Sequence, residues 1–204
     1  VRQLAGIELR ALGEDDEMAA RHRTWFADRV ERLEPAIGRS GRPEIMADLA
    51  ADQDNVRRAI TTGIVAGDDT VTLRLCTAMA TFWTSHGDWT EGCEQLRTAL
   101  EMPASDVRLR GRALVALGNL LLLRGDLAEA EVRLSEGRRL ATDPDDAVVL
   151  ARALAGEGYL EFRRSHLAEA QAVWQEALEI AQHAGDERVA AGVLRSLAIT
   201  AASC

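Results

Sequence analysis

The sequence predicts an all-α fold, and three observations lead to this prediction. Residues 112–141 recur, with the same order of small and apolar residues, as residues 152–181. Only four of the 204 residues are prolines, and runs of β-branched residues are absent, which favours helices over strands. Aromatic residues make up only 4% of the chain, while alanine and leucine abound. A period of about 40 residues, with two helices around a short turn in each unit, is typical of a helical repeat array.

The first third of the chain, residues 1–68, carries three segments with apolar residues at helical spacing. Asp15 or Asp16 can cap the second segment, and Pro43 suits the first turn of the third. We expect this part to link to a domain upstream. The three expected helices cover residues 1 to about 12, Asp15 or Asp16 to about Ile37, and Pro43 to near Gly67.

The second part, residues 69–204, contains the repeats. Each unit has a first helix, a short turn and a second helix, and the turns are marked by Gly87-Asp88, Gly125-Asp126 and Ser165-His166. The expected units cover about residues 70–103, 106–142 and 145–184, with a partial unit at 186–204.

Small and large residues alternate at fixed positions of these units, as close packing of paired helices requires. The first helix carries a small residue in each unit, the second helix another small residue, and a large apolar residue follows four positions later. These sets are Ala80, Gly118, Gly158 and Ala198; Gly92, Ala130 and Ala170; and Leu96, Leu134 and Trp174. The pattern resembles the tetratricopeptide repeat (TPR). The resemblance implies antiparallel helix hairpins stacked in a right-handed superhelix.

A narrower resemblance begins in the first part of the chain and continues into the first repeat unit. Asp54-Asn55-Val56-Arg57, Phe82-Trp83 and Glu91-Gly92 follow one another in the order found after the nucleotide-binding and winged-helix portions of large bacterial regulators. The chain thus resembles the repeat region of STAND-type ATPases with LuxR-type or SARP-like architecture. Asp54 and Asn55 have two interpretations: a contact to a ligand or neighbouring domain, or a structural hydrogen bond that fixes the third helix against the first repeat.

The resemblance implies a sensor array that works with nucleotide-binding and DNA-binding domains of the same polypeptide. The 204 residues contain no GxxxxGK[ST] phosphate-binding loop. The formal net charge of −9 opposes direct nucleic-acid binding, which needs a basic face. The expected partner is therefore a protein or a small-molecule effector, and a second copy of the chain is a further candidate.

Composition also bears on compartment and chemistry. No apolar run reaches the roughly 20 residues of a membrane span, and no signal peptide is visible. The three cysteines, Cys76, Cys93 and Cys204, have no metal-binding or redox spacing, which favours a reducing, cytoplasmic compartment. Cys76 occupies an apolar packing position and is expected to be a small buried residue. We expect no metal, no cofactor and no enzymatic activity.

The concave face of the expected array is the candidate binding surface. The same position of the first helix holds arginine in three successive units, and nearby positions supply a mixed polar and aromatic lining. An arginine row can bind carboxylates or phosphates through bidentate hydrogen bonds. It can equally pair with acidic residues of neighbouring helices. The candidate residues are Arg74, Arg112, Asn119, Leu122, Arg152, Tyr159 and Phe162.

The sequence thus favours a non-enzymatic sensor and protein-interaction module of a bacterial transcriptional regulator. A structural scaffold for oligomerisation, without a ligand, is the alternative from another class. A helical enzyme domain is a third interpretation, for which the sequence offers no constellation of catalytic residues.

Overall fold

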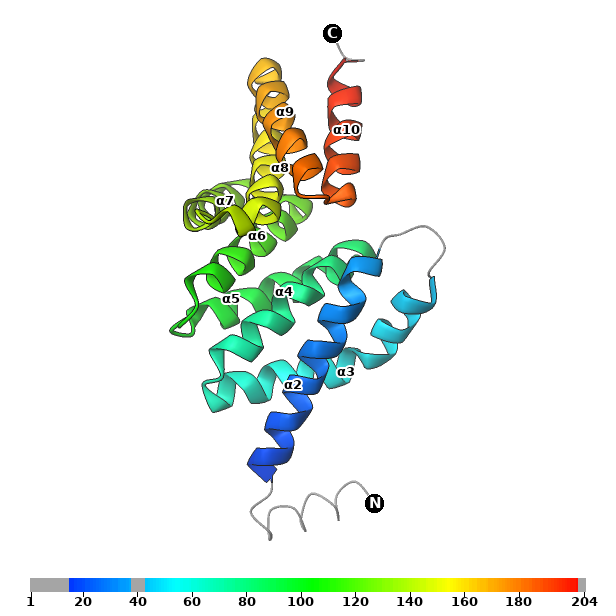
Figure 1. Ribbon diagram of the computed structural model, residues 1–204, viewed down its shortest axis with the longest axis vertical. Coiled ribbons are helices and arrows are strands. Elements are labelled where there is room, and N and C mark those ends of the chain that lie inside the picture. The colour runs from blue at the N-terminus through cyan, green and yellow to red at the C-terminus, as the bar shows by residue number, and fades with distance from the viewer. Residues whose placement is uncertain (1–14, 38–42, 202–204) are drawn as a thin grey trace.

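The protein is all-helical in its computed structural model, which describes residues 15–37 and 43–201. Over these ranges the structure contains no β-strand. The helix expected in residues 1–12 and the loop at 38–42 lie outside the described residues. The helices are α2 (Asp15–Leu33), α3 (Pro43–Ala66), α4 (Asp69–His86), α5 (Trp89–Glu101), α6 (Val107–Arg124), α7 (Leu127–Leu140), α8 (Ala147–Arg163), α9 (Leu167–His183) and α10 (Glu187–Ala201), with short 3-10 turns η1 (Glu34–Ala36) and η2 (Pro144–Asp146) (Figure 1).

The turns between helices have a clear local cause. Gly87 and Gly125 adopt left-handed backbone conformations, with φ of 96° and 88°, directly after α4 and α6. Glycine reaches this region without steric cost and so ends a helix cleanly. At the other end, Asp68 and Asp106 cap α4 and α6 by accepting backbone N–H groups three residues further on.

One expected boundary is wrong. The second helix was expected to extend to about Ile37, but α2 ends at Leu33 and the chain continues as the 3-10 turn η1. Pro35 lies in that turn and lacks the N–H group that an α-helix would need there. The early break places Glu34 in η1 rather than in α2, which matters for the site described below.

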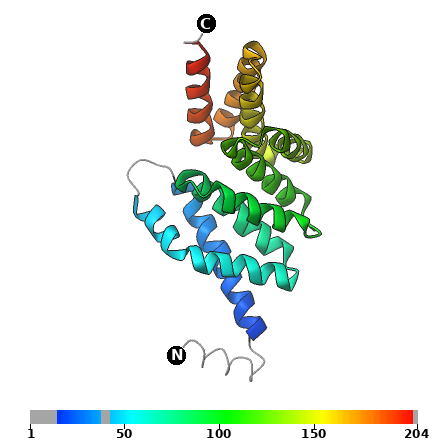
Figure 2. The ribbon, with the colours of Figure 1, turned by 180° about the vertical axis from the view of Figure 1, so that it is seen from behind.

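Helices contact their immediate neighbours in sequence and also their second neighbours. The even-numbered helices α2, α4, α6, α8 and α10 contact one another in succession, and each odd-numbered helix packs on the even-numbered helices around it. We call the even-numbered set the even layer. Figures 1 and 2 show α2 and α3 at one end of the molecule and α8, α9 and α10 at the other. Helices α2 and α3 join this packing through contacts with α4.

Small residues set the distance between paired helices. A Cβ atom built on Gly118 of α6 would lie 2.6 Å from Leu134 Cγ of α7, and one on Gly158 of α8 would lie 2.5 Å from Trp174 Cδ1 of α9. Leu134 also lies against Gly156 of α8, so its side chain fills the space between two hairpins. The small and large positions identified in the sequence therefore meet in the structure.

Buried apolar side chains form a continuous core from α2 to α8 and a smaller core among α8, α9 and α10. The smaller core centres on Trp174, whose indole Nε1–H donates to the carbonyl oxygen of Ala155 at 3.0 Å. Cys76 and Cys93 are buried in the larger core, as expected for Cys76. These two cores thus fix the positions of the even-layer helices relative to their neighbours.

Candidate functional site

Three arginines form a row along the even layer. Arg74 on α4, Arg112 on α6 and Arg152 on α8 are each the sixth residue of their helix. Because α4, α6 and α8 contact one another in succession, the row crosses from helix to helix. We call these three residues the arginine row. Each has at least one carboxylate within 4 Å.

Arg74 is fully engaged by the preceding even helix. Its Nε and Nη2 donate to the two carboxylate oxygens of Glu31 at 2.9 and 2.5 Å, and Nη2 also donates to Asp28 at 2.8 Å. The hydrogen bonds that Arg74 donates to Glu31, followed by the one to Asp28, raise the pKa of Arg74 above its usual value. This bidentate geometry joins α4 to α2.

Arg112 is the least constrained member of the row. Its only ion pair described is a long one, 3.9 Å from Nη2 to Asp146 Oδ1, and 47% of its side chain is exposed. The same Asp146 oxygen lies 3.1 Å from Arg108 Nε and 3.0 Å from Arg108 Nη2. Arg108 therefore binds Asp146 Oδ1 more closely than Arg112 does, and the Arg112 guanidinium remains accessible. Asp146 Oδ2 is buried without a hydrogen-bond partner among the described residues.

Arg152 lies between two carboxylates from opposite ends of the chain. Its Nη2 donates to Asp186 at 3.2 Å and lies 3.6 Å from Glu34 Oε1. Arg152 Nε is buried and has no hydrogen-bond acceptor among the described residues. An unpartnered buried donor is costly in a folded protein, so the guanidinium is only partly satisfied.

Asn119 and Leu122, the two candidates on α6 beside the row, have mainly structural surroundings. Asn119 Nδ2 donates to the carbonyl oxygens of Val115 at 3.0 Å and Arg152 at 3.4 Å. It therefore links α6 to the backbone of α8. Leu122 is only 7% exposed and belongs to the core, so it offers little surface to a ligand.

Tyr159 and Phe162 lie together further along α8. Their ring centroids are 6.4 Å apart, and Phe162 lies 5.9 Å from the ring of Trp174. The Tyr159 hydroxyl accepts a hydrogen bond from Arg163 at 3.2 Å. Both aromatic residues are half-buried against the smaller core. They are a partly accessible aromatic patch beside Arg163.

Sequence reasoning missed three charged residues that complete the surroundings of Arg152. Arg188 Nη2 donates to Glu34 Oε1 at 3.0 Å, and Asp186 caps α10 by accepting the Val189 N–H at 3.0 Å. A repeat alignment offers one signal, because Asp106 and Arg108 precede them at the same spacing. Glu34 has no such signal, since its position depends on the break after α2.

Charged pairs also join the odd-numbered helices. Arg57 of α3 donates through Nε and Nη2 to Glu91 of α5 at 2.6 and 2.7 Å, and Arg97 of α5 donates in the same way to Glu129 of α7 at 3.0 and 2.5 Å. Asp54 accepts from Arg57 Nη1 at 2.8 Å. Two separate sequence motifs, Asp54-Asn55-Val56-Arg57 and Glu91-Gly92, therefore meet. The residue that fixes α3 against α5 is Arg57, whereas the Asp54 hydrogen bond to Arg57 lies within α3 and the Asp54 side chain is 94% exposed.

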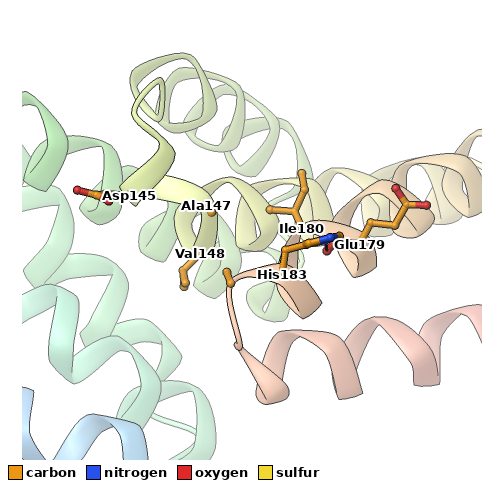
Figure 3. Close-up of a pocket in the computed structure, with 7 residues that line it drawn as sticks. Asp145, Ala147, Val148, Glu179, Ile180 and His183 are labelled. Atoms are coloured by element: carbon orange, nitrogen blue, oxygen red, sulfur yellow. Dashed lines mark hydrogen bonds between the residues drawn. The ribbon is translucent and has the colours of Figure 1, made fainter.

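A shallow depression of about 600 Å³ lies elsewhere, between the start of α8 and the end of α9 (Figure 3). Figure 3 shows Asp145 and Glu179 at opposite ends of it. His183 Nδ1 donates to the carbonyl oxygen of Glu179 at 2.7 Å rather than to a carboxylate. None of the candidate residues lines this depression. It is lined by Asp145, Ala147, Val148, Glu179, Ile180, His183 and Ala184.

The described part of the chain brings no group of three or more His, Cys, Asp or Glu residues together in a way that could hold a metal ion. Burial raises the pKa of the Cys76 thiol to about 12, so it is protonated at neutral pH and a poor nucleophile.

No protein-family model matches this sequence, and a search of curated proteins finds no significant match. Over residues 15–37 and 43–201, no helix has the length and apolar character that crossing a membrane requires.

Proposed function

We propose that the chain is a non-enzymatic sensor and protein-interaction module that binds an acidic partner or inducer on its even layer. Its hairpins form a TPR-like right-handed superhelix in this proposal, and its intact context is a bacterial STAND-type regulator with nucleotide-binding and DNA-binding domains. The observation that carries the proposal is the arginine row, and above all Arg112. Arg112 presents an accessible guanidinium with only a 3.9 Å carboxylate contact.

Guanidinium groups on successive helices suit a ligand with several carboxylates. Each group can bind one carboxylate through two parallel hydrogen bonds, and linked contacts reinforce one another. The net charge of −9 opposes unspecific attraction of an acidic ligand. If such a ligand binds, the attraction must therefore come from local positive charge on the even layer.

A ligand-free structural scaffold remains the second candidate, and one observation favours it. Every member of the arginine row has an acidic residue of a neighbouring element within 4 Å. Such pairs hold adjacent units in register without any partner. The gene sequence on either side of this chain separates the regulator from a free scaffold, because the regulator requires a GxxxxGK[ST] loop in the same polypeptide.

The binding proposal is tested with a fluorescein-labelled hexaglutamate peptide and fluorescence anisotropy. Arg112→Glu should raise the peptide Kd by at least about tenfold, since attraction becomes repulsion at that position. Arg139→Glu is the matched control, because it makes the same charge change at an exposed position on α7, in the other set of helices. Equal peptide affinity of the wild type and Arg112→Glu would refute the proposal, provided that circular dichroism shows both to be folded.

A further inference from the structure

Five polar residues from four separate parts of the chain meet at one place on the even layer. Glu34 comes from η1, Thr81 from α4 and Arg152 from α8. Arg188 lies in the first turn of α10, and Asp186 lies directly before that helix. We call this set the Glu34 cluster. Glu34 and Arg188 are 154 residues apart in the sequence, yet their side chains form a 3.0 Å hydrogen bond. Figures 1 and 2 both show the start of α10 close to the end of α2, where η1 begins.

The Glu34 carboxylate is the centre of the cluster. Its Oε1 accepts hydrogen bonds from the Thr81 hydroxyl at 2.8 Å and from Arg188 at 3.0 Å, and Arg152 Nη2 lies 3.6 Å away. All these contacts fall on the same oxygen. One carboxylate therefore serves two guanidinium groups through a single atom, whereas the Arg57–Glu91 pair uses both oxygens.

The two arginines of the cluster lie in unfavourable surroundings for different reasons. Arg152 Nε is buried without an acceptor among the described residues. Burial and the nearby positive charge of Arg152 lower the pKa of Arg188. Such surroundings disfavour two guanidinium groups unless anionic groups compensate them. A ligand that brings more carboxylate oxygens than Glu34 uses would bind there favourably.

The cluster is accessible to a ligand. The Glu34 side chain is 22% exposed, Arg152 32% and Arg188 41%. Partly exposed ion pairs contribute little net stability because water competes for them. Water, and likewise a ligand carboxylate, can therefore compete for the contacts of Glu34. Asp186 is held more firmly: burial opposes its ionisation, but the Val189 N–H and then Arg152 outweigh burial and lower its pKa.

We propose that Arg152 and Arg188 form a carboxylate-binding site that the chain's own Glu34 fills until an acidic ligand replaces it. This inference rests on the proposed function. It specifies the ligand class as a carboxylate and names Glu34 as the group that competes with the ligand. Exchange would free η1 from α10, so ligand binding would separate two parts of the chain that are 154 residues apart. The ligand then biases the conformation through its different affinity for the two states.

The test measures hexaglutamate binding to Glu34→Gln by fluorescence anisotropy. The glutamine keeps the size of the side chain and its acceptor for Thr81 but removes the competing charge. Because a self-filled site lowers the apparent affinity in proportion to the free fraction, the Kd should fall by at least about fivefold. Glu91→Gln is the matched control, since it makes the same charge change where Glu91 pairs with Arg57 on the odd-numbered helices. Its Kd should stay close to that of the wild type.

Two further arms define the site and the source of the carboxylate. The gain should disappear in the double variant Glu34→Gln/Arg188→Gln, which lacks one of the two guanidinium groups. Calorimetry with succinate distinguishes a small dicarboxylate from an acidic peptide as the ligand. If Glu34→Gln binds both succinate and hexaglutamate more tightly than the wild type, the site accepts any dicarboxylate. If only hexaglutamate binds more tightly, the site is assigned to an acidic peptide. Glu34→Gln binding neither ligand more tightly than the wild type would overturn the inference.

The inference and the proposed function can fail separately. An unchanged Kd for Glu34→Gln together with weaker binding for Arg112→Glu would reject the Glu34 exchange and retain the arginine row. Tighter binding for Glu34→Gln with no effect of Arg112→Glu would reject Arg112 as a binding residue and retain the Glu34 cluster. Thermal unfolding followed by circular dichroism checks that each variant is folded.

Discussion

At the scale of single residues, glycines determine how closely paired helices pack. The contact of Gly118 with Leu134, and that of Gly158 with Trp174, leaves no room for a methyl group. Both glycines occupy the same position of their units, and both face the large residue 16 positions further on. Protein interiors pack as densely as organic crystals, so a large side chain on one helix requires a small residue opposite it. This requirement explains why the two positions recur together.

Gly118→Ala should lower the free energy of unfolding by about 1–3 kcal/mol, because the new Cβ would lie 2.6 Å from Leu134 Cγ and force the helices apart. Gly192→Ala in α10 is the control. Its Cβ meets nothing within 4 Å, so the substitution should stabilise the helix by about 0.5–1 kcal/mol. Thermal unfolding by circular dichroism measures both. A Gly118→Ala variant as stable as the wild type would contradict the repeat register.

Residue patterns predicted packing better than they predicted ionic partners. The burial of Cys76 and the pairing of Gly118 with Leu134 follow from helical periodicity, which fixes the face of each residue. Leu122 shows the limit, because its burial depends on how neighbouring hairpins pack against α6. The partners of Arg152 depend on the positions of three separate elements, which local sequence does not determine.

At the scale of helices, bidentate ion pairs connect alternate members of the stack. Arg97 binds Glu129 across α5 and α7 in this way. The hydrogen bond from Arg97 lowers the pKa of Glu129, although burial opposes that shift. A carboxylate whose pKa is lowered by folding stabilises the fold above its unfolded pKa of about 4.3. That contribution disappears as the pH falls through the folded value.

Arg97→Gln should therefore lower the free energy of unfolding by about 0.5–1 kcal/mol near pH 7. The loss should be smaller near pH 3, because the stabilisation by ionised Glu129 in the wild type decreases as the pH falls through its lowered folded pKa. Urea denaturation at the two pH values measures the difference, and Arg139→Gln serves as the control. An equal loss at both pH values would mean that Arg97 acts through packing rather than through its charge.

Helix positions were largely predictable because their signals are local. Gly87 and Gly125 end α4 and α6, and the capping residues Asp68 and Asp106 lie directly before α4 and α6. The exception is the end of α2, where apolar spacing continued past Pro35 and suggested a longer helix. The missing N–H of proline prevailed over periodicity there.

At the scale of the whole molecule, most contacts join helices that are near neighbours in sequence. In such a stack, local packing sets stability and the shared surface spans several units. The Glu34–Arg188 bond departs from that scheme, because it joins the first and last described parts of the chain. Sequence periodicity could not reveal it, since it depends on how rotation accumulates from one hairpin to the next.

The central claim is that the even layer binds carboxylates through Arg112, Arg152 and Arg188. The most direct measurement is a ¹⁵N NMR titration of the arginine Nε–Hε signals with hexaglutamate, in a chain whose 24 basic residues are all arginine. The account predicts the largest shifts at Arg112, Arg152 and Arg188, with Arg57, Arg97 and Arg139 nearly unchanged. Shifts concentrated on Arg57, Arg97 and Arg139, which lie on odd-numbered helices, or no shifts at all, would contradict this claim.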